Sequence, residues 1–153
     1  MLIKIVLFIN LIAYAVIVSQ SFMYILALKN TQLALRAPSY IEVRHLIDVN
    51  MRSRFKYVLY LALLTSLALV ILQLKDPASI GLITAAIAFV VLVIDIVLTV
   101  KGNLPVNDII NGWTAENYPA NWQEMRQKWF TIFQYRQIAN ITGFISLLAG
   151  IVF

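Results

Sequence analysis

The sequence predicts an all-α integral membrane protein, a four-helix bundle with an additional interfacial or cytoplasmic helix in its first loop. Hydrophobic residues make up 61% of its 153 residues and charged residues only 12%, about half of the ~25% found in soluble domains. A soluble protein of this composition would expose apolar patches far larger than soluble monomers tolerate. The length suits a single domain, 1–153. We therefore expect membrane lipid to be its main partner.

Four long stretches with few charges predict the membrane helices. A bilayer core of ~30 Å needs roughly 20 helical residues, and none of these stretches alternates as a strand would. We expect the helices at about 3–30, 55–74, 77–101 and 122–153. Asp76-Pro77 predicts the start of the third, with aspartate as N-cap and proline in the first turn. The second and third helices would then form a tight antiparallel hairpin.

A further amphipathic helix is expected in the first loop, at about 39–54. Ser39-Tyr40-Ile41-Glu42 resembles a capping box. An apolar stripe follows at Tyr40, Val43, Ile47 and Met51, while the charged residues fall mostly elsewhere. This pattern is typical of an interfacial helix. It also fits a cytoplasmic extension of the second membrane helix that packs on a neighbour.

The second long loop combines a short helical segment with the start of the final helix. Pro105 to Asn111 predicts one or two turns, closed by Gly112. Asn121-Trp122-Gln123-Glu124 imitates a capping box and predicts the start of the last helix there.

The basic residues predict the orientation in the membrane. Of the 12, only Lys4 and Lys75 lie on one side. The other ten fall in or beside the two long loops: Lys29, Arg36, Arg44, Arg52, Arg54, Lys56, Lys101, Arg126, Lys128 and Arg136. The positive-inside rule then puts both long loops in the cytoplasm and both termini outside. The net charge of +5 thus reflects topology, and we expect no nucleic-acid partner.

The composition limits the chemistry. Cysteine is absent, which excludes thiolate metal sites and thiol nucleophiles. His45 is the one histidine, so a zinc site would need carboxylates for nearly every other ligand. We expect no metal.

Two charges within membrane helices are candidates for function. Asp95 lies in the third predicted helix, where an unpaired carboxylate would cost several kcal/mol. Arg136 lies at a similar depth in the fourth. We expect them to pair inside the bundle beside a polar cavity open to the cytoplasm. A purely structural ion pair, or an Arg136 side chain that reaches the headgroups, is the alternative.

Polar and aromatic residues near this pair are candidates for ligand binding. Asn103, Pro105 and Asn107 directly follow the third helix, and Trp113 follows them. Amides that face a cavity bind oxygenated ligands well, although the same residues also form structural turns. Trp129 and Asn140 share one stripe of the last helix with Arg136. An aromatic belt would equally explain the tryptophans, and interhelical hydrogen bonding would explain Asn140.

The run Leu104-Pro105-Val106-Asn107, followed by Trp113, Trp129 and Arg136, resembles the anthrone-oxygenase-like family of small four-helix membrane proteins. The resemblance covers the second half of the chain; the first half agrees in helix count and in its long basic loop. Most members are uncharacterised bacterial proteins, which implies a bacterial inner membrane. Relatives with an assigned activity oxidise aromatic polyketide anthrones to anthraquinones with dioxygen. The resemblance implies this activity, and it implies that no cofactor takes part.

By position, the resemblance assigns Pro105, Asn107, Trp113, Trp129 and Arg136 to the family's shared core. Many relatives carry a histidine one turn before the arginine, where this chain has Phe133. If that histidine deprotonates a phenolic substrate, Asp95 or His45 would have to replace it here, or the oxygenase activity would be absent.

Three functions remain open from the sequence. The first is a cofactor-independent oxygenase for an apolar aromatic, polyketide- or quinone-like ligand, in which Arg136 stabilises a developing oxyanion while Asn103 and Asn107 orient the substrate. The second is a non-catalytic accessory or binding subunit with a structural Asp95–Arg136 pair, and the third a small transporter. A roomy pocket lined by Asn103, Asn107, Trp129 and Arg136 would favour a ligand site. A homo-oligomer or a protein partner is left open.

Overall fold

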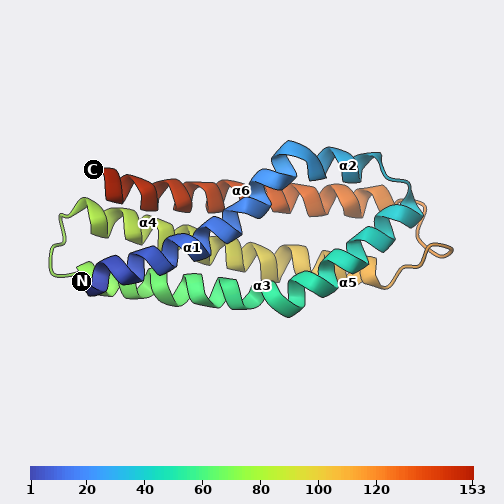
Figure 1. Cartoon of the computed structure of the whole chain (residues 1–153). Helices are drawn as coiled ribbons and strands as arrows, with labels where there is room; N and C mark the ends of the chain where they lie inside the picture. The colour runs from blue at the N-terminus through green and yellow to red at the C-terminus, as the bar shows by residue number, and fades with distance from the viewer.

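The computed structural model describes every residue, Met1–Phe153, and all of its regular elements are helical, as predicted (Figure 1). The helices lie side by side in an elongated bundle, with both termini at one end. In chain order the elements are α1 (Leu2–Met23), a π-helical turn (Tyr24–Leu28), α2 (Lys29–Ala34), α3 (Ala37–Gln73), α4 (Ile80–Leu98), a second π-helical turn (Thr99–Asn103), α5 (Leu104–Asn111) and α6 (Trp122–Val152).

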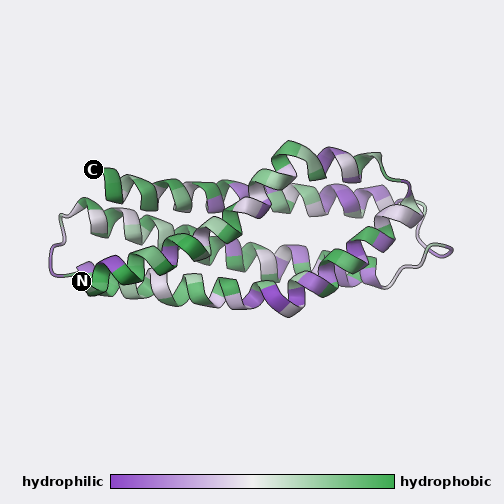
Figure 2. Ribbon diagram, in the orientation of Figure 1, coloured by the Kyte–Doolittle hydropathy of each residue, from purple (hydrophilic) through white to green (hydrophobic).

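Three helical stretches are long and apolar enough to cross a membrane: Leu2–Ala34, Ala37–Gln73 and Ile80–Asn111. In their most apolar windows only 17% to 28% of the residues are buried inside the bundle, so most of these side chains face outward. Figure 2 shows hydrophobic residues along the half that holds both termini and polar ones toward α2, α5 and the start of α6. An outward-facing apolar surface of this extent is compatible with lipid contact.

The first half of α3 differs from the expected separate helix at 39–54. Residues 37–73 form one continuous helix, which corresponds to the alternative of an extended second membrane helix. No glycine or proline interrupts the chain near residue 55, and the residues there tolerate a helix well. The predicted cap at Ser39 is wrong: Arg36 is the N-cap and Pro38 lies in the first turn.

The helix ends near the other loops agree with the sequence to within a few residues. α4 begins at Ile80, where the Ser79 hydroxyl accepts a hydrogen bond from the Leu82 amide at 3.2 Å. The predicted cap at Asp76 is therefore wrong, because the Asp76 carbonyl instead accepts the Ser79 amide and hydroxyl in the preceding turn. Gly112 ends α5 as predicted. Asn121 precedes α6, but its side chain donates to the Glu124 carboxylate instead of capping the helix.

The apolar core joins α1, α4 and α6 at one tyrosine. Tyr14 of α1 is fully buried, and its hydroxyl donates to the Ala88 carbonyl of α4. Its ring lies directly against Gly143 of α6, where a Cβ atom would overlap it. Small residues allow such close helix contacts in membrane bundles. Gly143 therefore sets how closely α6 approaches α1.

We expect Gly143→Ala to destabilise the protein by about 1–3 kcal/mol, because the added methyl group must displace a buried, hydrogen-bonded ring. Reversible unfolding in detergent measures this difference in the free energy of unfolding. Gly112→Ala is the matched control, since its Cβ would meet only carbonyl oxygens at 3.4 Å or more. Equal stability of the two variants would contradict the expectation.

Candidate functional site

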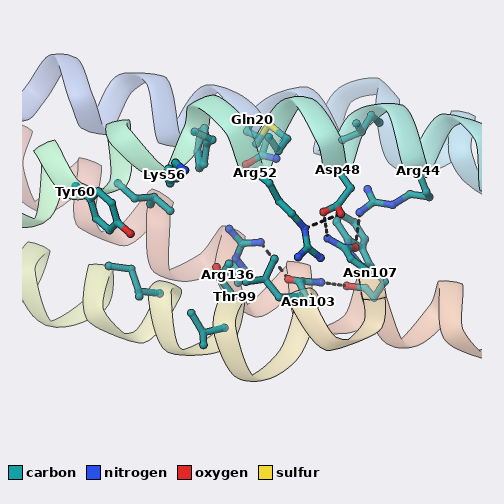
Figure 3. Close-up of a pocket in the computed structure, with 18 of the residues that line it drawn as sticks. Gln20, Arg44, Asp48, Arg52, Lys56, Tyr60, Thr99, Asn103, Asn107 and Arg136 are labelled. Atoms are coloured by element: carbon teal, nitrogen blue, oxygen red, sulfur yellow. Dashed lines mark hydrogen bonds and ion pairs between the residues drawn. The ribbon is translucent and has the colours of Figure 1, made fainter. Parts of the chain in front are cut away.

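A cavity of about 330 Å³ lies between α3 and the α4–α5 stretch, with residues of α6 at its deep side (Figure 3). One end is polar and is lined by Arg44, Asp48, Asn103, Asn107 and Arg136. The other end is mainly apolar and is lined by Phe55, Leu59, Leu63, Ile96 and Val100, with Lys56 and Tyr60 on the same side. The cavity thus crosses from the polar to the hydrophobic half of the bundle (Figure 2).

Arg136 is held rigidly at the deep side of the cavity. Its Nε donates to Asp95 Oδ1 at 2.7 Å, and its Nη1 donates to Asn103 Oδ1 at 3.1 Å. Asp95 is completely buried and does not line the cavity, whereas Arg136 does. Nη2 makes no hydrogen bond within the chain. The ion pair predicted from the sequence therefore positions a guanidinium with one nitrogen still free for a ligand.

The two asparagines connect the cavity to the rest of the bundle. Asn103 ends the second π-helical turn and donates to the Trp129 carbonyl at 3.0 Å. Asn107, one helical turn later, accepts from Arg44 Nη2 and donates to Asp48 Oδ1, both at 2.7 Å. Each amide thus has a donor and an acceptor partner in the protein, so both fix the arginines more than they offer free groups to a ligand.

Three charged residues of α3 belong to the site although the sequence interpretation left them out. Arg44, Asp48 and Arg52 follow one another at intervals of four residues and therefore share one helix face. Asp48 Oδ2 accepts from Arg52 Nε and from Asn111 Nδ2, both at 2.7 Å. Arg44 and Asp48 lie off the apolar stripe of this helix, yet both are buried, and they hydrogen-bond to asparagines of α5. Their regular spacing was the available signal.

Trp129 lines the cavity, and it contacts Arg44 through its ring and not through a polar atom. The Arg44 guanidinium lies over this ring, 4.0 Å from its centre. The Trp129 ring also stacks with the Phe133 ring, with 4.9 Å between the two ring centroids, and it packs against Tyr24. The position expected to hold a histidine, Phe133, is therefore part of an aromatic cluster and does not line the cavity.

Several predicted site residues lie away from the cavity. Trp113 packs at the edge of the aromatic cluster, and Pro105 is exposed in the first turn of α5. Asn140 is buried one helical turn after Arg136 in α6, and its side-chain oxygen has no hydrogen-bond partner. His45 Nε2 lies 3.1 Å from the Ile110 carbonyl, outside the cavity. Of the predicted residues, the structure brings Asn103, Asn107, Trp129 and Arg136 together at the cavity.

No group of three His, Cys, Asp or Glu side chains is arranged to hold a metal ion. Comparison with family models, curated proteins and solved structures finds no match to the chain. The resemblance to the anthrone-oxygenase-like family therefore stays a prediction.

Proposed function

We propose that this protein is an integral membrane protein that binds an apolar aromatic molecule with an oxygenated group in the cavity between α3 and α4. The observation that supports this most is the cavity itself, in which a fixed guanidinium faces an apolar compartment. Its volume of about 330 Å³ lies near the lower end of the ~300–1,000 Å³ typical of small-molecule pockets. A ring system with one polar end would fill it.

In this proposal α6 is a fourth membrane helix beside the three apolar stretches. Gln137 and Asn140 lower its overall hydropathy, but both are buried against other helices and would not contact lipid. Four of the ten basic residues used for orientation line the cavity, and setting them aside leaves six against two. The positive-inside rule therefore still favours cytoplasmic long loops and outside termini. The polar end of the cavity would face the cytoplasm of a bacterial cell.

The family resemblance would add a reaction to this binding function. In anthrone oxidation a ring CH₂ becomes C=O, one oxygen atom of dioxygen is incorporated, and the other leaves as water. Arg136 Nη2 is free to stabilise the enolate oxygen of such a ligand. A base is harder to identify, because Asp95 and His45 lie outside the cavity and both oxygens of Asp48 already accept hydrogen bonds. We therefore propose binding as the primary function and oxidation as an extension of it.

Filling the apolar end of the cavity is expected to abolish ligand binding. Leu63→Trp would occupy this end without touching the polar network. Leu64→Trp is the matched control, because Leu64 is the next residue, is 66% exposed and lies outside the cavity. We expect mass spectrometry of extracts from the purified proteins to find one specific aromatic compound with the wild type and Leu64→Trp, and its loss with Leu63→Trp. Extracts that contain only bulk lipid in all three samples would contradict the proposal.

The recovered compound would also separate binding from catalysis. Consumption of one dioxygen molecule per ligand, lost in Leu63→Trp, would support the oxygenase extension. Stable binding with no oxygen uptake would favour a non-catalytic accessory or binding protein.

A further inference from the structure

The cavity carries positive charge that the protein does not balance. Four cations line it against one carboxylate: Arg44, Arg52, Lys56 and Arg136 against Asp48. Two further carboxylates beside the cavity, Asp95 and Asp108, pair with Arg136 and Arg52. Three carboxylates therefore face four cations, and one positive charge is in excess.

Arg44 is the cation whose burial makes this excess costly. Arg44 is only 2% exposed, and no carboxylate lies within ion-pair distance of its guanidinium. Its hydrogen bonds go to neutral groups, the Tyr24 hydroxyl at 3.4 Å and the Asn107 side-chain oxygen at 2.7 Å. Its Nε has no acceptor. Buried charges in proteins are normally paired, and the contact with the Trp129 ring compensates only in part.

Three guanidinium groups, those of Arg44, Arg52 and Arg136, line the same cavity. Arg44 and Arg136 are held on Asn107 and Asn103, two amides one helical turn apart. Figure 3 shows Arg52 reaching from α3 into the space between Arg136 and Asn107. Hydrogen bonds from guanidinium to an anionic oxygen are about twice as strong as those between neutral groups. The polar end is therefore suited to a negatively charged oxygen group.

We propose that the ligand is a singly charged anionic amphiphile, with a carboxylate- or phenolate-type group at the polar end that Arg44, Arg52 and Arg136 line, and an apolar body toward Leu63. This inference rests on the proposed binding function and specifies the charge of its ligand. A neutral quinone would leave Arg44 without a counter-charge. A diacyl phospholipid would exceed a volume of about 330 Å³, so a single ring system or single short chain fits better.

The test compares ligands that differ only in charge. Naphthalene-2-carboxylate and naphthalene-2-carboxamide have nearly the same shape, and so do decanoate and decanamide. Comparing the first pair with the second shows whether the cavity prefers a ring system or an alkyl chain. Binding of all four is measured by titration calorimetry to the full-length protein in nanodiscs of zwitterionic phosphatidylcholine. Arg44→Gln removes the buried charge, and Arg54→Gln removes an exposed charge of the same helix outside the cavity.

For the wild type and Arg54→Gln we expect each anion to bind about tenfold more tightly than its amide. For Arg44→Gln we expect this preference to disappear while the amides still bind. Equal binding of anion and amide to the wild type would overturn the inference and leave the binding function intact. An equal loss of preference in Arg54→Gln would also overturn it, since surface charge would then be the cause. If no probe binds and no compound co-purifies, both proposals fail. If Arg44→Gln does not fold, the comparison of anion and amide binding to the wild type still tests the inference.

Discussion

Replacing Arg136 with leucine is expected to lower the free energy of unfolding by about 3–5 kcal/mol, because the substitution leaves Asp95 as a buried carboxylate without a partner. Asp95 is completely buried and its Oδ2 already lacks a hydrogen bond, so the remaining oxygen depends on Arg136 Nε at 2.7 Å. Asn103 would lose a donor at the same time. Reversible unfolding in detergent measures the difference.

The double variant Asp95→Leu/Arg136→Leu separates the cost of the stranded charge from the value of the pair. Removing both charges is often close to neutral for stability, so the double variant should recover most of the loss. Its cavity should nevertheless bind the ligand more weakly, because one of the three guanidinium groups that line it is gone. A single variant as stable as the wild type would show that Asp95 does not need its partner.

Replacing Asp48 with leucine is expected to cost about 3 kcal/mol, since hydrogen bonds to charged groups contribute ~1.5–3 kcal/mol each when their partners are left unpaired. Asp48 is 4% exposed and accepts from Arg52, Asn107 and Asn111, so it joins α3 to α5. The Arg44 guanidinium would also lose the carboxylate to which Asn107 links it.

Asp108→Leu is the control for this prediction. Asp108 also pairs with Arg52, but 64% of its side chain is exposed, and exposed ion pairs contribute only ~0–1 kcal/mol. We expect it to remain close to the wild type in the same unfolding assay. A similar loss in both variants would mean that Arg52, and not the buried carboxylate, carries the connection between the helices.

The helical class was predictable because long apolar stretches without alternation leave few other structures. The exact helix boundaries were harder to predict where two neighbouring residues can each begin a helix. Asp76-Pro77 and Ser79 both can begin a helix, and the outcome depends on a turn in which the Asp76 carbonyl accepts two hydrogen bonds from Ser79. For α3 the sequence allowed both a separate helix at 39–54 and one extended helix, because no glycine or proline near residue 55 favours a break.

The site was predictable where a charge falls inside an apolar stretch. Asp95 is the single charge in an apolar stretch, and Arg136 is the single charge between Lys128 and the C-terminus, so their pairing could be inferred. Arg44 and Asp48 lie in a segment with many charges, where burial of two of them leaves no compositional trace. Their partners, Asn107 and Asn111, are about 60 residues away in the chain. Only the tertiary structure reveals that these groups satisfy one another.

The π-helical turn at Thr99–Asn103 gives the chain one place where its length can change without moving the cavity. Its hydrogen bonds span five residues instead of the four of an α-helix, so the turn holds one residue more than an α-helical turn. Deleting one residue there would convert it to an α-helical turn and leave the direction of α5 relative to α4 largely unchanged. A deletion in the α-helical part of α4 would instead rotate everything after it by ~100°, and Asn103 and Asn107 would leave the cavity. A relative with the same cavity can therefore have a one-residue gap at Thr99–Asn103, but not in α4, when its sequence is aligned with this one.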